Sequence, residues 1–560
     1  MKRYASIDFM RGLAIFMMLV LHIISDLLDL PALLADMGKL TLLELLLLIV
    51  LPFLGGLAGF FLMISSIGNT ISMQKQLMRG KSNKDVAKRQ VLGGFLLLIF
   101  AMLTEGLLGY HGLIGEIFKH LDNLSAIDWT VPLWRGYHFE TIHAIAWCVI
   151  VNGAVHAYLT RDGKWKDIKK LTKQYIILAV VVLALTPLMW YLADLIVPGY
   201  PYDIDDKTGR ILMYAEIGKS SIWDVIIRFI LAPFAAAWEP IFPYLAASFL
   251  GTIIGIYLSQ EKKDVDRSYI KKYLKFGLLM FVIGAIGVII NLVWVVLQQG
   301  IDPALDVYID ISEHRSWTLE ENGVPFLGWL FQFLLLNGFS ICGITMVIRS
   351  VEFRGRGKKL ADQTKFIRRL GFVAFTAYTM QYIYNFAFFI VSSIFTAPYV
   401  RMGWGPVMLA LGLSLLIYHG LTWLWEKISY VGSMEWMIGT IASYLVPGKR
   451  VKGYTWWKRG QLDVQNAFYD AEWIDIIDED EIDHKRFSES RYAYKIARLG
   501  FIFFPFSFMA YRMAKNAVNK EEPNKFQKKA EKLALGGIIF FIVWLVLSIS
   551  LKLATLGISF

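Results

Sequence analysis

Two side chains in the first apolar segment, Arg11 and His22, have the types and the spacing to act on one ligand. Eleven residues turn a helix through roughly 1100°, about 20° past whole turns, so both side chains share one face. The same eleven residues rise about 16 Å, around half of a hydrocarbon core roughly 30 Å thick. An ionisable side chain facing lipid costs on the order of 3 kcal/mol, so this shared face predicts a functional cavity. A guanidinium there could bind an anion, and an imidazole could act as a general base or nucleophile.

Acidic residues accompany both side chains on the same helix. Asp8 precedes Arg11 by three residues, and we expect the two to pair. Asp26 follows His22 by four residues, and we expect it to orient the imidazole. The alternative is that Arg11 only marks the cytoplasmic start of a helix and that His22 only hydrogen-bonds a neighbouring helix.

A second carboxylate and histidine, Glu140 and His143, lie near the predicted external end of another apolar segment. They are one turn apart on one face, and His143 lies at a depth that could approach His22. The alternative is that both are interfacial residues wetted by external water. Glu239, between Trp238 and Pro240, either lines the same vestibule or caps the following helix.

Membrane helices must position all of these side chains. The chain has 560 residues, of which 56% are hydrophobic and only 18% are charged, which is typical of a polytopic membrane protein. The prediction is an all-α bundle of about eleven transmembrane helices. The apolar segments lie at residues 9–27, 43–67, 91–109, 139–159, 175–197, 238–258, 274–297, 325–348, 370–395, 405–426 and 535–557.

The net charge of +11 is concentrated in alternate connections between these segments. Lysines and arginines, Lys88 and Arg89 among them, fill the second, fourth, sixth and eighth connections, whereas the odd connections are acidic. The positive-inside rule then predicts a multi-pass protein of the cell membrane with a cytoplasmic N-terminus, and this pattern does not favour a nucleic-acid partner. The sequence contains only two cysteines, so we do not expect a disulfide framework. It contains no H-E-x-x-H or P-loop motif, and we expect no metal cofactor.

The composition predicts three regions. Residues 1–448 form the transmembrane domain, and residues 449–498 form an acidic cytoplasmic insert that is partly disordered. Residues 499–560 contain a final transmembrane helix, preceded by an apolar segment at 499–515 that Pro505 interrupts. We expect this segment to be interfacial or re-entrant, because it is too short to span a bilayer.

The first helix resembles a known signature. An arginine, ten further residues and a histidine, with the local form R-G-L-A, resemble the first helix of the acyltransferase-3 superfamily. The wider context at residues 6–14, with Met17 and Met18, is similar to the heparan-alpha-glucosaminide N-acetyltransferase catalytic family. Residues 51–71, 139–147 and 238–255 resemble later segments of that family in the same order, and His143 falls on its motif histidine.

Segments nearer the C-terminus, at 371–385 and 432–439, resemble the related YeiB-type membrane proteins, so the resemblance spans about residues 3–440. Gln381 stands where members of the superfamily often have a histidine. Residues 450–560 match nothing in the family.

The resemblance implies transfer of an acyl group, which the family's name gives as acetyl, from cytoplasmic acyl-CoA to an extracytoplasmic sugar or lipid-linked acceptor. Arg11 and Asp8 would then serve donor binding, and His22, Asp26, His143 and Glu140 would serve catalysis. Membrane lipid and the glycolipid or carbohydrate acceptor are the expected partners, and a homodimer stays open. The rival hypothesis is a transporter or lipid flippase that uses the same charged face without acyl chemistry. A third is an inactive relative that acts as a scaffold.

Overall fold

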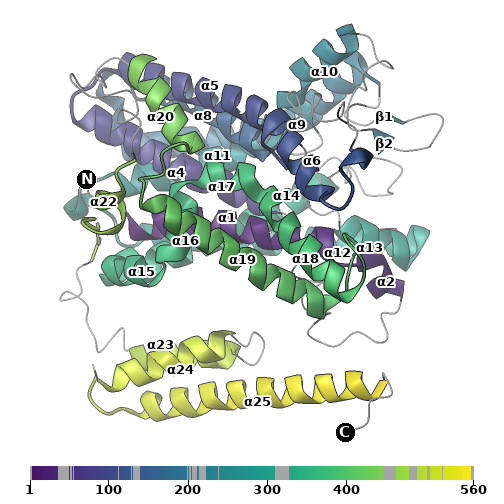
Figure 1. Ribbon diagram of the computed structural model, residues 1–560. Helices are drawn as coiled ribbons and strands as arrows, with labels where there is room; N and C mark the ends of the chain where they lie inside the picture. Colours follow the sequence, from purple (N-terminus) through teal and green to yellow (C-terminus); the bar gives the residue numbers. More distant parts are fainter. Residues whose placement is uncertain are drawn as a thin grey trace. The chain divides into compact units, whose positions relative to one another are not determined.

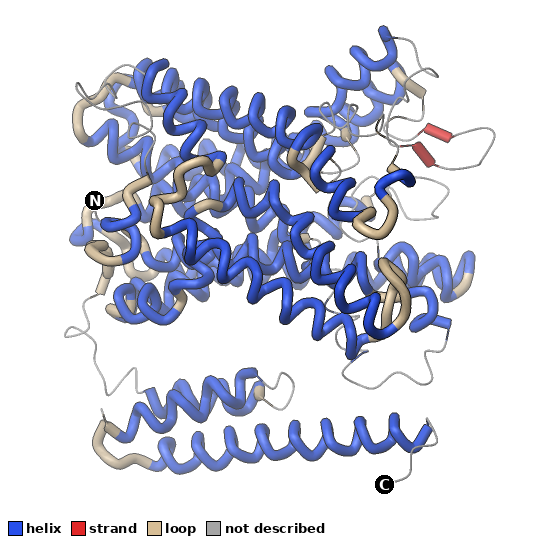
Figure 2. The backbone as a smooth tube through the Cα atoms, viewed as in Figure 1, coloured by secondary structure: helices blue, strands red, loops and turns tan. Residues whose placement is uncertain are grey.

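The structure, a computed structural model, describes residues 3–35, 44, 50, 53–54, 56–110, 112–127, 129, 139–198, 200, 203–204, 211–212, 222–236, 239–309, 327–445, 462–477, 489–500, 505–519 and 521–555. The chain divides into two compact units, Met1–Ile476 and Ile477–Phe560. The predicted all-α fold is confirmed (Figure 1). The strands within the described residues are two residues long each, β1 (Asp203–Ile204) and β2 (Ile211–Leu212), and they pair antiparallel (Figure 2).

Eight helices within the described residues are long and apolar enough to cross a membrane, which makes the chain a multi-pass membrane protein. Each coincides with one of the eleven predicted segments. They are α1 (Ala5–Leu27), α5 (Asn83–Leu107), α8 (Thr141–Leu159), α9 (Ile168–Ile196), α11 (Ile241–Leu258), α12 (Tyr269–Gln299), α14 (Gly328–Val351) and α19 (Trp404–Glu426).

Further helices of the first unit connect or flank these eight. They are α2 (Leu30–Ala35), α4 (Leu57–Met78), α6 (Leu113–Lys119), α10 (Ile222–Ala235), α13 (Ile301–Ile309), α15 (Gly357–Gln363), α20 (Met434–Leu445) and α22 (Val464–Phe468), with short 3-10 turns η2 (Leu124–Ala126), η3 (Arg161–Lys166), η4 (Lys262–Asp264) and η6 (Glu352–Arg354).

The prediction of one continuous helix at residues 370–395 is wrong, because the segment is interrupted. It consists of α16 (Lys365–Phe372), α17 (Ala374–Thr379), the 3-10 turn η7 (Met380–Ile383) and α18 (Tyr384–Phe395). The break between α16 and α17 lies at Val373, whose backbone angles are not helical. Apolar composition predicted a continuous helix here, and the local tertiary contacts described below account for the interruption.

A close crossing of α1 and α16 fixes the position of the first helix. A Cβ atom on Gly12 would lie 1.7 Å from the carbonyl oxygen of Ile367, and one on Gly371 would lie 2.4 Å from the backbone nitrogen of Gly12. The two backbones therefore touch, as small residues allow in membrane helix packing. This contact explains the glycine that follows Arg11.

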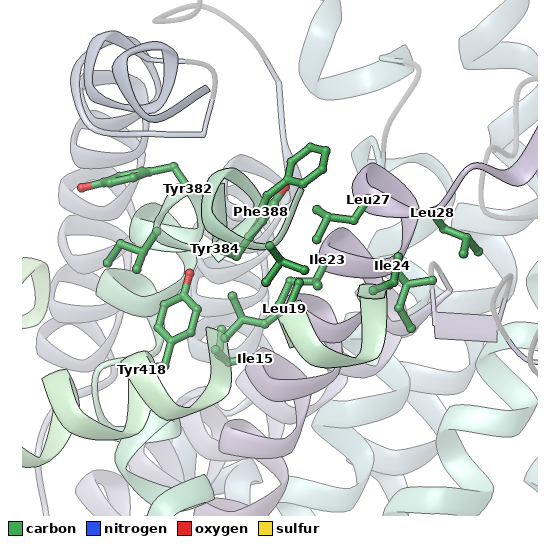
Figure 3. Close-up of a cluster of buried hydrophobic side chains, with 14 of the residues drawn as sticks. Ile15, Leu19, Ile23, Ile24, Leu27, Leu28, Tyr382, Tyr384, Phe388 and Tyr418 are labelled. Carbon is green, nitrogen blue, oxygen red and sulfur yellow. The ribbon is translucent and has the colours of Figure 1, made fainter. Parts of the chain in front are cut away.

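A face of α1 beside the one that carries Arg11 and His22 is anchored in an apolar cluster (Figure 3). Ile15, Leu19 and Ile23 are fully buried there and follow one another at helical spacing. Tyr384 and Tyr418, from α18 and α19, pack against the same cluster. Because this face is buried in protein, the stripe that carries Arg11 and His22 must face a different part of the bundle.

Part of the predicted cytoplasmic insert belongs to the first unit. Residues 462–476 contact the N-terminus of α1, since the Arg3 N–H donates to the Glu472 carbonyl at 2.9 Å and the Ile474 N–H donates to the Arg3 carbonyl at 2.8 Å. The Ile476 N–H donates to the Glu352 carbonyl at 2.8 Å. The first unit therefore includes residues 462–476, and the division of the chain into three regions stays a prediction.

The second unit is built of three helices, α23 (Glu489–Leu499), α24 (Pro505–Val518) and α25 (Lys525–Thr555). Buried alanines line their contacts, including Ala493, Ala514 and Ala530. The segment predicted as interfacial corresponds to α24, a separate helix of 14 residues that begins at Pro505. Whether it lies at an interface stays a prediction.

Candidate functional site

A cavity of about 480 Å³ lies inside the first unit, and both Arg11 and His22 line it. From α1 it is lined by residues at positions 11, 14, 18, 21 and 22, which form one helical face. The other walls come from α4, α5, α8, α17 and α20, together with Glu239. Arg11 and His22 thus face one space, at positions separated by about 16 Å along the helix axis.

One end of the cavity, which we call the arginine end, contains Arg11, Asn69 and Arg89. Arg89 lies at this end because its Nη1 donates to Gln76 Oε1 at 3.3 Å on α4. The adjacent residue Lys75 has its Nζ 5.7 Å from the centre of the Tyr4 ring, which directly precedes α1. Within the described part of the chain Arg11 forms no ion pair. Two guanidinium groups on different helices can therefore act on one anionic ligand.

The hydropathy pattern does not indicate Arg89 as a site residue, because it predicts a connection before residue 91. The α5 helix begins earlier, at Asn83, with Ser82 as its N-cap. Ser82 Oγ accepts from the Asp85 N–H at 3.1 Å and donates to the Asp85 carboxylate at 2.7 Å. The Ser-x-x-Asp spacing was a visible N-terminal signal that would have placed Arg89 on a helix.

The other end, which we call the histidine end, contains His22, Thr141 and Glu239. Thr141 is the first residue of α8, and α8 runs antiparallel to α5, because Asn83 at the start of α5 donates to Thr160 Oγ1 just past the end of α8 at 2.8 Å. This antiparallel arrangement puts Thr141 far from Arg89. The cavity wall between the two ends is mainly apolar, with residues such as Phe61, Ile64 and Ile145.

Asp26 does not bind the His22 imidazole, which corrects the prediction. Its carboxylate accepts hydrogen bonds from the hydroxyls of Tyr110 and Tyr384. These two rings stack with centroids 5.8 Å apart, and the Tyr110 ring lies 6.2 Å from the His22 ring. Two tyrosines that are distant in sequence therefore occupy the carboxylate of Asp26, and one of them, Tyr110, also contacts the His22 ring.

Asp8 does not pair with Arg11, which is a second correction. Its carboxylate forms an ion pair with Arg3, with Nε to Oδ2 at 2.8 Å and Nη2 to Oδ1 at 3.0 Å. Arg3 is held in position by its backbone contacts with residues 472 and 474. The spacing of three residues predicted Arg11 as the partner of Asp8. The observed partner is Arg3, whose backbone is held by hydrogen bonds to residues 472 and 474.

Glu140 and His143 take part in the N-terminus of α8. Glu140 is the N-cap residue, and its N–H donates to His143 Nδ1 at 3.2 Å as part of a capping box. His143 is 3% exposed and is not among the cavity-lining residues. Glu140 lies near enough to interact electrostatically with His22. Glu140 thus interacts with His22 electrostatically, whereas His143 is buried at the N-terminus of α8 and does not line the cavity.

Glu239 lines the histidine end rather than capping α11, whose N-cap is Pro240. Its Oε2 accepts a hydrogen bond from the Thr141 hydroxyl. Of the two interpretations drawn from the sequence, the vestibule position is the observed one.

Glu435, on α20, accounts for the helix break at Val373. Its Oε1 accepts from the Phe375 N–H at 2.6 Å, and its Oε2 accepts from the Thr376 hydroxyl at 2.6 Å. The carboxylate therefore satisfies the N-terminus of α17 inside the bundle. Glu435 also lines the cavity, a position that no local sequence signal indicated.

The cavity thus combines a basic end with an end that holds an imidazole and carboxylates. Such an arrangement can hold a long anionic molecule at the arginine end and carry out proton transfer at the histidine end. Among the described residues, no group of three or more His, Cys, Asp or Glu could hold a metal ion.

Comparison with known proteins bears on this architecture. No curated protein and no solved structure matches the chain. A profile of the heparan-alpha-glucosaminide N-acetyltransferase catalytic domain matches residues 3–296, which is more than half of the 560 residues. The match includes α1, α4, α5 and α8 of the cavity wall but ends before α17 and α20, so the resemblance of residues 371–385 and 432–439 to YeiB-type proteins stays a prediction. The chain belongs to the heparan-alpha-glucosaminide N-acetyltransferase catalytic family.

Proposed function

We propose that this membrane transferase moves an acetyl group from cytoplasmic acetyl-CoA to an extracytoplasmic sugar or lipid-linked acceptor. The observation that carries the proposal is the single cavity that Arg11 and His22 share. Its two ends match the two ends of the donor, because the phosphates of CoA are anionic and its thioester lies at the tip of a long pantetheine arm.

At the arginine end, Arg11 and Arg89 bind the phosphates of the donor through charge-assisted hydrogen bonds. The basic connections on the predicted cytoplasmic side raise the local concentration of this anion. The mainly apolar wall between the ends then encloses the pantetheine arm, and the thioester reaches His22.

At the histidine end, the His22 imidazole takes a proton from the acceptor hydroxyl or amine as that atom attacks the thioester carbon. A carbon–oxygen or carbon–nitrogen bond forms, the carbon–sulfur bond breaks, and the thiolate of CoA receives the proton. An acetyl-imidazole intermediate on His22 is the alternative route to the same products. Glu140 stabilises the imidazolium that direct transfer creates, because opposite charges attract.

One observation favours the transporter alternative. Interrupted membrane helices are common at transporter binding sites, and the segment from α16 to α18 is interrupted beside the cavity. In transporters the freed helix N-terminus is available to the substrate. Here Glu435 already occupies the N-terminus of α17, which favours a fixed wall over a moving gate.

The test is transfer across a membrane. Purified protein is reconstituted in liposomes with acetyl-CoA labelled in its acetyl group on one side and methyl α-D-glucosaminide on the other. Label in the amide product on the acceptor side supports the enzyme. Passage of unmodified acceptor without label in any product supports the transporter. The absence of both acetyl transfer and acetyl-CoA binding in a folded protein would contradict the proposed function.

A further inference from the structure

Layers of small buried residues hold the three helices of the second unit in register, and each layer takes one residue from α23 or its end, one from α24 and one from α25. The layers are Ala493, Ala514 and Ala530, then Ala497, Ala510 and Ala534, then Gly500, Ser507 and Gly537. A Cβ on Gly500 or on Gly537 would collide with Ser507 Oγ, so the third layer is closely packed. Seven residues separate the first layer from the third along each helix, which is about 10 Å.

Exposed cations from all three helices gather around the first two layers, and we call them the cationic cluster. Its nine side chains are Arg491, Lys495, Arg498, Arg512, Lys515, Lys525, Lys528, Lys529 and Lys532. The described residues between 489 and 532 contain four glutamates as well, so this part of the unit has a net charge of +5. Lys515 forms an ion pair with Glu531 at 2.8 Å, whereas Lys528, Lys529 and Lys532 form no ion pair with a described residue. The cluster is therefore largely free to bind an external anion.

Large apolar side chains are exposed around the third layer and beyond it, and we call this part the apolar end. With exposed fractions of 37–55%, they are Phe506, Phe508, Ile539, Phe540, Ile542 and Val543. A water-soluble anionic partner that bound only the cationic cluster would leave this apolar surface in water. Lipid satisfies both surfaces, because its phosphates are anionic and its acyl chains are apolar.

The distance between the two surfaces fits a membrane interface. Between the outer edge of a bilayer and its hydrocarbon core lie roughly 5–8 Å of headgroups, and long cationic side chains reach outward beyond their own backbone. Aromatic rings accompany the cations, since Tyr494 and Phe526 have centroids 5.9 Å apart, and Arg491 and Lys525 lie 5.1 and 5.6 Å from the Phe526 ring. Aromatic and cationic residues are enriched together at this depth of a bilayer.

We propose that the cationic cluster is a binding site for the phosphate headgroups of anionic lipids, whose acyl chains cover the apolar end. Ammonium and guanidinium groups donate charge-assisted hydrogen bonds to phosphate oxygens. Because three helices contribute, more cations surround one headgroup than a single helix could supply. The proposal is separate from the proposed function, since the cavity is lined by residues of the first unit between 11 and 442.

The test compares two lipids with identical acyl chains, dimyristoyl phosphatidylglycerol, which is anionic, and dimyristoyl phosphatidylcholine, which has no net charge. Full-length protein in a neutral detergent is titrated with each lipid, and bound lipid is measured by native mass spectrometry. The wild type is expected to bind the anionic lipid at least about fivefold more tightly. A triple variant with Lys528→Gln, Lys529→Gln and Lys532→Gln should lower this preference by about threefold or more.

The matched control neutralises three exposed lysines beside the start of α9 in the first unit, with Lys166→Gln, Lys169→Gln and Lys170→Gln. The change in charge is the same, but these lysines lie on one stretch of chain rather than among three helices, and the preference should stay unchanged. A second variant replaces residues 528, 529 and 532 by arginine. It keeps the charge and should keep the preference, which separates loss of charge from loss of folding.

Three outcomes would overturn the proposal. Equal binding of the two lipids by the wild type would favour the acidic stretch at residues 478–483, which lies outside the described residues, as the partner of these cations. A preference that survives in the triple glutamine variant, or that falls equally in the control, would show that the cluster has no specific role. Binding of glycerol 3-phosphate as tight as that of the anionic lipid would show a site for free phosphate, because this probe has no acyl chains.

Discussion

The two ends of the cavity are built in different ways. Arg11 and Arg89 are carried by the interiors of α1 and α5, where helical periodicity sets the direction of each side chain. At the histidine end, Thr141 and Glu239 lie at or before helix N-termini and are joined by a hydrogen bond between elements 98 residues apart in sequence. The arginine end is therefore determined mainly by local structure, and the histidine end by tertiary contacts.

We expect the two ends to have separate functions, donor binding at the arginine end and proton transfer at the histidine end. Long guanidinium side chains tolerate small displacements of their helices, as binding of a flexible anion allows. Proton transfer requires tighter geometry, and a displacement of about 1 Å can cost roughly a hundredfold in rate. Substitutions at the arginine end should accordingly change donor affinity, whereas substitutions at the histidine end should change turnover.

The strongest test of this division is His22→Ala. Loss of the general base or nucleophile should lower turnover by about 10²- to 10⁴-fold, while acetyl-CoA affinity stays within about twofold of the wild type. Acetyl transfer and calorimetric titration measure the two quantities on the same preparation. Normal turnover in this variant would remove His22 from the proposed site.

At the opposite end, Arg11→Ala should weaken acetyl-CoA binding by about tenfold or more, because one charge-assisted hydrogen-bond donor is lost. Turnover at saturating donor should change little. Arg89→Ala is expected to act in the same direction, and the loss in each variant should shrink at high salt. A fall in saturated turnover with unchanged affinity would contradict the assignment of the arginine end to binding.

Gly12→Ala tests whether the helix crossing holds the arginine end in place. The added Cβ would lie 1.7 Å from the Ile367 carbonyl oxygen, so α1 and α16 must separate at an expected cost of about 1–3 kcal/mol. The midpoint of thermal unfolding in detergent should fall, and donor affinity should fall with it. The matched control is Gly343→Ala in α14, where a Cβ meets nothing within 4 Å and stability should stay equal or rise.

The smallest expected effect is that of Tyr384→Phe, which removes one of the two hydroxyls bonded to Asp26. The free energy of unfolding should fall by about 1 kcal/mol, and turnover should fall more than donor affinity because the contact lies at the histidine end. Tyr191→Phe, at a side chain that is 59% exposed, serves as the control for the substitution itself. Equal loss in the two variants would show that the Asp26 contact has no specific role.

The sequence by itself determined the membrane-helical class and the face that Arg11 and His22 share. Both follow from local physics, because composition decides whether a segment enters lipid and a period of 3.6 decides which side chains align. The N-terminus of α5 is also readable from the sequence, through the spacing of Ser82 and Asp85.

Only the tertiary structure decided the partners of the charged groups. Asp26 binds tyrosines 84 and 358 residues away, and Asp8 binds an Arg3 that a remote segment holds in position. Glu435 reaches the cavity from α20, and Glu239 reaches it from the residue before the N-cap of α11, through packing that no local pattern specifies. Local spacing shows which residues could form a hydrogen bond with a charged group. The bond that forms is to the buried group that packing brings nearest, and this is decided only by the tertiary structure.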